Sequence, residues 1–286
     1  MNLKIFQTIH KPFPRKSCDW ITPVAVGNYS EPGAVKDNTG DNISHLNPYY
    51  AEFTTMYWAW KNAQDYDAIG FYHYRRYLHV MHHEQDFTWE GKIDKGSHFQ
   101  VDYTQNQHFL ETVASDAYKN RIIDMLSATE VISGFPMRFD VPIPQQWIQH
   151  HPVEPLQVFL DELVKQYPNH QQLIKVFFSK YGQICWPVFV MRRETFMKFA
   201  DELFGLLHNV FAKIGTPYDA YNNRYVCFLV ERFLPLWFML HRINPNFVPT
   251  VTFFSNQHSI ETGDPVPAGF KIQNSGARVQ PGFSAR

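Results

Sequence analysis

Apolar and polar positions follow two different periods along the first eighty residues. Residues 3–9 form a short apolar run of the kind that makes a buried strand, and a polar loop covers residues 27–45. Large apolar side chains then recur at helical spacing over residues 47–62, which start at Asn47, a good N-cap, followed by proline. Residues 68–72 form a second buried run. This strand, loop, helix and strand order predicts a mostly parallel α/β sheet with helices on both faces.

The same patterns extend this prediction to residue 240. We expect helices over residues 110–126, 156–167, 171–179, 195–212 and 225–240, the last kinked at Pro235, and strands over 130–135 and 184–191. Residues 81–107 and 142–155 are expected to be irregular. Residues 261–286 are rich in Gly, Pro and Ser, which predicts an irregular or partly disordered tail. We therefore expect one domain over residues 1–260 and a tail over 261–286.

Composition narrows the class of protein. The chain has 286 residues, 26 basic against 27 acidic and a net charge of −1, so its overall charge gives no general attraction to nucleic acid or anionic lipid. Its three cysteines, Cys18, Cys185 and Cys227, are far apart and form no CxxC pair, which favours a reducing cytoplasm. The most apolar stretch, residues 226–240, carries charges and a proline and falls short of a membrane span.

The most unusual polar segment is His73-Tyr74-Arg75-Arg76-Tyr77. It follows the second predicted strand, and ligands of open α/β sheets bind beyond the carboxyl ends of the strands. Paired arginines suit a diphosphate, since guanidinium groups bind phosphate oxygens bidentately, and a histidine can ligate a metal or donate to a leaving phosphate. If the strand continues, Arg75 and Arg76 alternate in direction, and only one of them reaches the phosphates. The alternative is a solvated strand end with one structural salt bridge.

Two more segments follow the first strand. Thr8, His10 and Lys11 stand at its end, where a doubly wound fold begins its nucleotide site. The loop from Asp37 to Asn42 has the short polar side chains that bind a ribose, a sugar or a phosphate, which is equally the composition of a tight turn. We expect these segments to share one cleft with the His73 segment. The chain has no dinucleotide fingerprint and no P-loop. Asp65-Tyr66-Asp67 precedes a strand, so we interpret it as a turn and not as a metal-binding Asp-x-Asp.

Carboxylates near histidines supply candidates for acid–base chemistry. His150 and His151 with Glu154 could serve a sugar hydroxyl, or could be a chance cluster among 14 histidines. Glu231 lies in an otherwise apolar helix, where a carboxylate is either paired with Arg232 or Arg224 or presented to a cleft.

Taken in order, these motifs resemble the DUF4422 family, bacterial glycosyltransferase-like proteins of capsule, exopolysaccharide and O-antigen gene clusters. The resemblance covers residues 3–242, is densest before residue 80, and rests on residues 8–13, 37–44, 47–50, 57–62 and 73–77. It implies a GT-A-like fold, and some members of the family are similar to galactofuranosyltransferases. The later matches are looser, and Cys185-Trp186-Pro187 departs from the family's usual start of that strand.

The resemblance implies glycosyl transfer from a nucleotide sugar, UDP-linked and with galactofuranose as one option, to a polysaccharide or lipid-linked acceptor. Donor binding is then assigned to Thr8, His10, Lys11, Asp37, Asn38, Asp41, Asn42, His73, Tyr74, Arg75 and Arg76. Glu231, Glu154 or Asp41 is assigned as the base if the reaction inverts the configuration of the sugar, whereas a retaining reaction requires no such base. His150, His151 and Trp186 are assigned to the acceptor.

The metal requirement stays open at this point. Mn²⁺ or Mg²⁺ is one expectation and metal-independent transfer is the other, with no metal ligands assigned. We expect a cytoplasmic protein, with peripheral association at the inner face of the cell membrane as an option, and no nucleic-acid partner. Two other functions compete with glycosyl transfer: a metal-dependent hydrolase of phosphorylated sugars, and a non-catalytic carbohydrate-binding protein.

Overall fold

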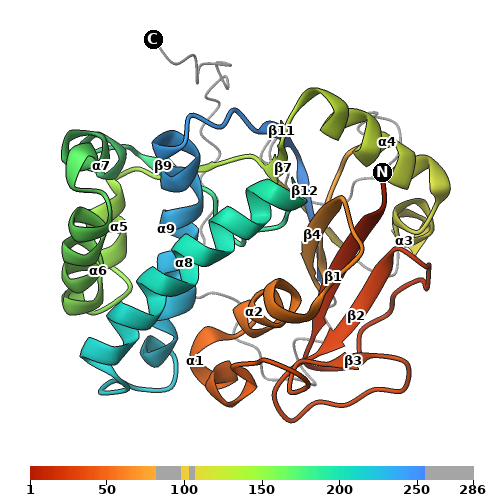
Figure 1. Ribbon diagram of the computed structural model, residues 1–286, viewed down its shortest axis with the longest axis horizontal. Helices are drawn as coiled ribbons and strands as arrows, with labels where there is room; N and C mark the ends of the chain where they lie inside the picture. Colours follow the sequence, from red (N-terminus) through yellow and green to blue (C-terminus); the bar gives the residue numbers. More distant parts are fainter. Residues whose placement is uncertain (82–97, 103–106, 255–286) are drawn as a thin grey trace.

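A mostly parallel β-sheet forms the centre of the computed structural model, which describes residues 1–81, 98–102 and 107–254. Its main strands lie in the order β11, β7, β10, β4, β1, β2, β3 (Figure 1). All pairs in this series are parallel except those of β10, which runs antiparallel to β4 and β7. The strands comprise β1 Leu3–Ile9, β2 Ile21–Ala25, β3 Val35–Lys36, β4 Ala68–His73, β7 Val131–Gly134, β10 Phe189–Arg192 and β11 Asn246–Val248.

A second group of strands continues from the carboxyl end of β4. The chain reverses at Tyr74 and Arg75, so that His73 pairs with Arg76 across an antiparallel turn. Strand β12 pairs with β5 in antiparallel and with β6 in parallel register. These strands are β5 Arg76–Leu78, β6 His98–Asp102 and β12 Thr250–Phe254, and a separate small ladder joins β8 Met137–Arg138 to β9 Gly182–Gln183.

Helices cover both faces of the sheet, as the sequence predicts (Figure 1). On one face, Phe71 of β4 packs against Phe196 of α8 and Phe189 of β10. On the other face, Tyr72 of β4 hydrogen-bonds to Tyr118 of α4 at 2.8 Å. The helices comprise α1 Asn47–Tyr50, α2 Phe53–Asn62, α3 Gln107–Val113, α4 Asp116–Ala128, α5 Ile143–Ile148, α6 Val153–Gln166, α7 Gln171–Phe178, α8 Arg193–Ile214 and α9 Tyr225–Leu240, with short 3₁₀ turns at Ser44–Leu46, Pro168–His170 and Asn222–Arg224.

Several predicted boundaries differ from the structure. The helix expected over 47–62 is broken at Ala51, which has a φ of 44°, and the Asn47 side chain donates to the Ala51 carbonyl at 2.9 Å. The helix expected over 110–126 is split because Ser115 caps a new helix by accepting the Tyr118 amide at 3.2 Å.

Other segments expected to be irregular contain regular structure. Residues 98–102 form β6, and α5 lies within 142–155. The strand expected over 184–191 is confined to Phe189–Arg192, two residues after Pro187. Strand β2 was not predicted at all. The predicted tail, 261–286, lies outside the described residues.

Candidate functional site

A cavity opens at the carboxyl ends of β1 and β4, beside the first turn of α2. It is small: water-sized molecules can occupy about 10 Å³ of it, within about 320 Å³ of empty space that includes the part open to solvent. It is lined by Thr8, Glu52, Phe53, Met56, Phe71, Tyr72, His73, Arg76, Trp186, Pro187 and Val188. The cavity therefore lies at the edge of the sheet where ligands of α/β proteins bind.

Strand register brings the first two polar groups of the cavity together. Thr8 of β1 stands directly opposite His73 of β4 in the parallel ladder. The strand does not continue beyond His73, so the condition for an alternation of Arg75 and Arg76 is not met, because the chain turns back at Tyr74 and Arg75. This turn returns Arg76 to the cavity beside His73, whereas Arg75 is not among the lining residues. Thr8, His73 and Arg76 are thus brought together as expected.

Arg76 is the cation that lines the cavity. Its guanidinium carbon lies 4.9 Å from the centre of the Trp186 ring, and its Nε has no hydrogen-bond partner among the described residues. Burial, followed by the charge of Arg75, lowers the pKa of Arg76 to about 10. A group with that pKa is still cationic at neutral pH. The wall of the cavity consequently holds a positive charge whose buried Nε has no hydrogen-bond partner in the described part of the chain.

More positive charge surrounds His73. Burial first, then Arg76, His10, Arg75 and Lys11, hold the pKa of His73 well below its usual range. The His10 ring centre lies 5.9 Å from that of His73. His73 is therefore neutral at physiological pH, and the charges around it favour an anionic ligand.

Two carboxylates flank this positive cluster. The Glu231 side chain, 14% exposed, accepts the Trp186 main-chain amide at 3.0 Å and an Arg232 N–H at 3.2 Å. Burial raises the pKa of Glu231, and the negative charge of Glu52 adds to the rise, whereas Arg232, the Trp186 amide and Arg76 oppose it. Trp186 itself has a φ of 51°, a left-handed conformation that a tryptophan rarely adopts. Glu231 is thus held behind Trp186, at the cavity wall.

Glu52 is the carboxylate that lines the cavity, and it is not among the residues predicted from the sequence. It immediately precedes α2, whose inward residues Phe53 and Met56 also line the cavity. The Glu52 carboxylate makes no hydrogen bond or ion pair with any other part of the chain that the structure describes. One signal was available: Glu52 is the sole acidic residue between Asp41 and Asp65, and it adjoins the buried face of the predicted helix.

The loop from Asp37 to Asn42 has a different place from the one expected. Asp37 is fully buried and accepts hydrogen bonds from Ser44 Oγ at 2.6 Å and Thr54 Oγ1 at 2.7 Å, so it joins the loop to α2. Asp41 exchanges hydrogen bonds with Asn62, the last residue of α2. A ten-residue helix is about 15 Å long, and the cavity lies at its other end.

Asn38 and Asn42 of this loop, like Asp41, do not line the cavity. Asn38 is exposed, and the Asn42 side chain donates to the Gly40 carbonyl at 2.9 Å. The expectation that this loop shares a cleft with His73 is therefore wrong for Asp41, and Asp41 does not lie where a base beside Arg76 would be needed.

The predicted acceptor residues lie next to Glu231 along α9. His151 stacks on Phe228 at 4.2 Å between ring centres, and Phe228 precedes Glu231 by one helical turn. Burial and Arg232 lower the pKa of His151 to about 4. His151 and Trp186 both adjoin the Glu231–Arg232 pair.

Glu154 and His150 are less closely tied to this pair. Exposed Glu154 accepts a hydrogen bond from the Tyr218 hydroxyl at 2.6 Å at the start of α6, and His150 is exposed. The Glu154 carboxylate, which the sequence suggested as an alternative base, is thus engaged in a hydrogen bond with Tyr218.

Asp65 and Asp67 lie at the opposite end of β4, where Asp67 accepts the Asn2 amide at 2.6 Å. This is the amino-end position that the sequence predicts. Among residues 1–81, 98–102 and 107–254, no group of three or more His, Cys, Asp or Glu side chains is arranged to hold a metal ion. No described helix is both long and apolar enough to cross a bilayer.

A family model described as a domain of unknown function, DUF4422, matches residues 4–242. The chain belongs to the DUF4422 family. The match confirms the resemblance drawn from the ordered motifs, almost to its boundaries. A search of curated proteins gives no match to this DUF4422 chain.

A solved structure shares the fold of this DUF4422 chain. The apo structure of the bifunctional glycosyltransferase WbbM has a TM-score of 0.75 and 22% sequence identity, over 88% of this chain and 45% of that one. The chain thus spans less than half of WbbM. At this identity the likeness shows the fold, which is GT-A-like, as the family resemblance implies.

Proposed function

We propose that this DUF4422 chain is a glycosyltransferase that uses a nucleotide-sugar donor. The observation that carries the proposal is the position of Arg76, a cation with an unpartnered Nε in a cavity at the carboxyl ends of β1 and β4. The fold shared with WbbM, whose name states that it is a glycosyltransferase, supports the reaction class. We further propose a UDP-linked donor, with galactofuranose as one candidate sugar, and a bacterial surface polysaccharide or its lipid-linked precursor as the acceptor.

In this proposal Arg76 binds the donor diphosphate. Its guanidinium donates two parallel hydrogen bonds to phosphate oxygens, while Arg75 and Lys11 add positive potential from the rim. Negative charge grows on the diphosphate as its bond to the sugar breaks, so these cations stabilise the transition state more than the bound donor. They supply the charge that a divalent cation supplies in metal-dependent transferases. We therefore propose transfer without Mn²⁺ or Mg²⁺.

Glu52 is the base in this proposal, for a transfer that inverts the configuration of the sugar. Its carboxylate lines the cavity and has no described partner, whereas Glu231 is held by the Trp186 amide and Arg232. Glu52 takes the proton of the acceptor hydroxyl as that oxygen bonds to the anomeric carbon, and the bond from this carbon to the phosphate oxygen breaks with its electron pair leaving on the diphosphate. Trp186 and His151 border the route by which the acceptor arrives.

The proposal is tested by a thermal-shift screen against nucleosides, nucleoside diphosphates and nucleotide sugars, because a ligand specific for the folded state raises the melting temperature. We expect stabilisation by one nucleoside diphosphate and by its sugar derivatives. The bound derivative is then incubated with glycan acceptors to detect the released nucleoside diphosphate. Stabilisation by sugars alone, with no response to any nucleotide, would show a carbohydrate-binding protein instead.

A further inference from the structure

Four aromatic side chains gather beside the Glu231–Arg232 pair, near the start of α9. The ring centre of Tyr221 lies 5.8 Å from that of His151 and 5.3 Å from that of Phe228, and the His151 and Phe228 rings stack at 4.2 Å. The Trp147 ring centre lies 4.8 Å from that of His151. We call these four residues the Tyr221 cluster. Its rings come from α5, from the segment between α5 and α6, from the segment before α9 and from α9 itself.

Exposure increases from one end of the Tyr221 cluster to the other. Trp147 is fully buried and lies against the Arg232 guanidinium, whose carbon is 4.9 Å from the ring centre. His151 and Phe228 are half-buried, and Tyr221 is 53% exposed. An aromatic ring that packs on its neighbours and is still half open to solvent offers a flat apolar surface to a ligand.

Hydrogen bonds hold Tyr221 in this position. The Asp219 carboxylate accepts the main-chain amides of Tyr221 and Asn222, each at 2.9 Å. The Asn223 side chain accepts the Tyr218 amide at 2.9 Å and donates to the Tyr218 carbonyl at 2.7 Å. The segment that carries Tyr221 is therefore ordered before a ligand arrives, so binding there loses little conformational entropy.

Polar side chains surround the open ring of Tyr221. His150 is exposed, and its ring centre lies 6.4 Å from that of His151. Exposed Glu154 is hydrogen-bonded to the segment that carries Tyr221, and half-buried Asn222 directly follows Tyr221. An apolar ring with donors and acceptors at its edge matches a sugar, which carries C–H groups on one face and hydroxyls around its rim.

The Tyr221 cluster is also close to the candidate site. Phe228 precedes Glu231 by one turn of α9. Partial burial raises the pKa of the Tyr221 hydroxyl, while Arg224 opposes the rise, Glu231 adds to it and Arg232 opposes it. The charges behind the wall of the cavity thus reach the Tyr221 hydroxyl.

We propose that Tyr221 is the platform for a sugar ring of the acceptor. The sugar places its C–H face on the open side of the Tyr221 ring, and its hydroxyls exchange hydrogen bonds with His150, Asn222 and Glu154. The assignment to the acceptor rests on the proposed function, whereas the binding of a sugar ring to Tyr221 does not.

The position of the Tyr221 cluster relative to the sheet suits an acceptor. The first strand of a doubly wound fold supplies part of the nucleotide site. In Figure 1, β1 and β2 lie on one side of β4, and α5, α6 and α9 lie on the other. A nucleotide over β1 and a sugar on Tyr221 would therefore approach Arg76 from opposite sides. Inversion at the anomeric carbon requires this arrangement, because the incoming oxygen attacks the face opposite the leaving group.

The test is ligand-observed NMR, by saturation transfer and titration, with the methyl glycosides of galactose, glucose, mannose, rhamnose and N-acetylglucosamine, each with and without UDP. We expect at least one glycoside to bind. Tyr221→Ala should weaken its binding about tenfold, which corresponds to about 1.4 kcal/mol for the aromatic contact and the apolar area that the ring covers. Tyr221→Phe should keep most of the affinity, since it keeps the ring.

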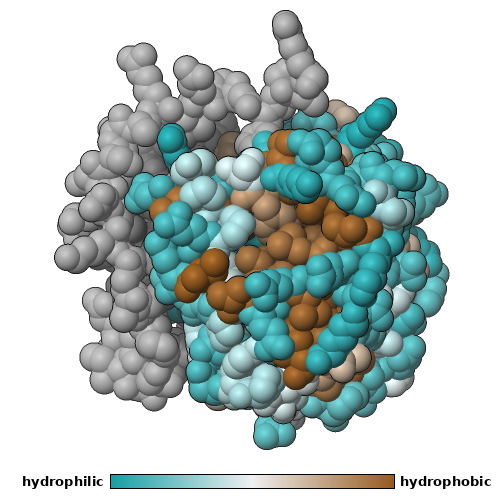
Figure 2. Space-filling model, turned by 90° about the vertical axis from the view of Figure 1, so that its left-hand side faces the viewer, coloured by the Kyte–Doolittle hydropathy of each residue, from teal (hydrophilic) through white to brown (hydrophobic). Residues whose placement is uncertain are grey.

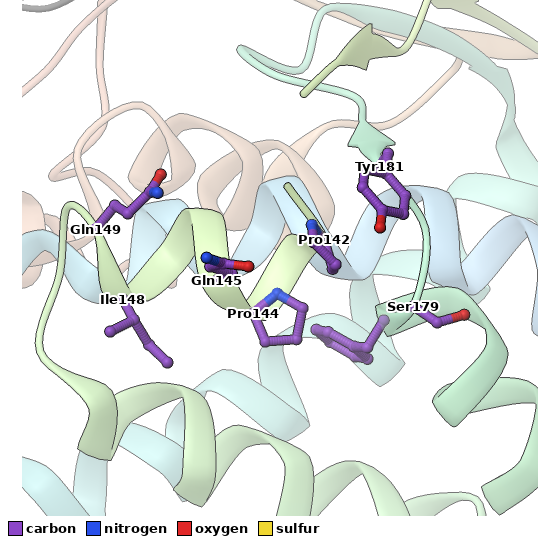
Figure 3. Close-up of a pocket in the computed structure, with 8 residues that line it drawn as sticks. Pro142, Pro144, Gln145, Ile148, Gln149, Ser179 and Tyr181 are labelled. Carbon is purple, nitrogen blue, oxygen red and sulfur yellow. The ribbon is translucent and has the colours of Figure 1, made fainter. Parts of the chain in front are cut away.

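Tyr181→Ala is the matched control. Tyr181 is 52% exposed, nearly as much as Tyr221, and it lines an open groove together with Pro142, Pro144 and Ile148 (Figure 3). Figure 2 shows apolar surface gathered on the side of the molecule that carries α5 and α7. The control therefore asks whether an exposed tyrosine beside apolar surface is sufficient for sugar binding, and we expect Tyr181→Ala to bind the glycoside as the wild type does.

Three results would overturn the inference: wild-type protein that binds none of the glycosides with or without UDP, Tyr221→Ala that binds them as Tyr181→Ala does, or Tyr221→Phe that loses binding. Thermal unfolding shows that each variant is folded, and thermal shift with nucleotides tests the proposed function on the same samples. Glycoside binding through Tyr221 without any response to nucleotides would contradict the proposed function alone. A response to nucleotides without glycoside binding would contradict the platform alone.

Discussion

The guanidinium carbon of Arg76 lies 4.9 Å from the centre of the Trp186 ring, and the main-chain amide of the same tryptophan donates to Glu231. Trp186 thus connects the cation of the cavity with the carboxylate behind its wall. The strand β4 and the turn after it deliver Arg76, whereas Trp186 comes from the segment before β10. The cavity is assembled from segments more than one hundred residues apart in the chain.

Replacement of Arg76 by alanine should weaken binding of the nucleotide-sugar donor by about 10- to 150-fold, because a charge-assisted hydrogen bond contributes about 1.5–3 kcal/mol. Arg75→Ala should have a smaller effect, since Arg75 does not line the cavity. Arg76→Lys should restore binding in part, because lysine lacks the bidentate fork. Calorimetric titration measures all three. Arg193→Ala, at the amino end of the sheet near Tyr66, is the control. If Arg76→Ala binds the donor with wild-type affinity, the diphosphate does not bind in this cavity.

The two carboxylates of the site should respond differently to replacement by glutamine. Glu52→Gln should lower kcat by about 10²- to 10⁴-fold with donor affinity unchanged, as expected for loss of a general base. Glu231→Gln should mainly lower the free energy of unfolding, by about 3 kcal/mol, because it leaves buried Arg232 without its ionic partner. Kinetics and chemical denaturation of both variants separate these effects. The opposite assignment, with Glu231 as base, predicts an active Glu52→Gln enzyme.

His151 should make the fold sensitive to mild acid. Its pKa of about 4 lies below the usual histidine value, so below pH 6.5 the unfolded chain binds a proton that the folded chain does not. His151 therefore leaves the free energy of unfolding unchanged above pH 6.5. Below that pH the free energy of unfolding decreases, by about 3 kcal/mol in total as the pH falls toward 4.

His151→Phe should remove most of that loss, and His150→Phe, at the exposed neighbouring position, should not. Urea denaturation between pH 7 and pH 4 measures the difference. Equal pH slopes in the two variants would contradict the assignment.

Gly70, in the middle of β4, should not tolerate a larger residue. A Cβ there would lie 2.9 Å from Val190 Cγ2 and 3.0 Å from both Ile5 Cγ1 and the Phe189 carbonyl oxygen. Gly70→Ala should therefore lower the free energy of unfolding by about 1–3 kcal/mol. Gly205→Ala, on the exposed surface of α8 with no atom within 4 Å of the added carbon, should raise it by up to about 1 kcal/mol. Thermal unfolding of the pair provides the comparison.

The sequence was sufficient for features that depend on local pattern. β1 and β4 lie where apolar runs predicted them, and their parallel pairing follows from the helix between them. The cationic segment after β4 was recognised from residue types alone. Identification of Arg76, not Arg75, as the lining residue required the two-residue turn, which no periodicity indicates.

Other features of the site depend on tertiary contacts. Asp41 and Glu52 are both polar residues close to α2 in sequence, but they lie at opposite ends of that helix. The loop of Asp41 is held there by Asn62, a contact across 21 residues that composition does not reveal. Trp186 enters the cavity through a left-handed backbone conformation that its residue type argues against.

The most direct test of the central claim compares nucleotides that differ only in their phosphates. Calorimetric titration of the wild-type protein, in EDTA, should be made with a nucleoside, its monophosphate and its diphosphate, beginning with uridine, UMP and UDP. If Arg76 and its neighbours hold a donor diphosphate without a metal, affinity should rise with each phosphate, and the diphosphate should bind at least tenfold more tightly than the nucleoside. Equal affinity for nucleoside and diphosphate, or no binding of any nucleotide, would contradict the account.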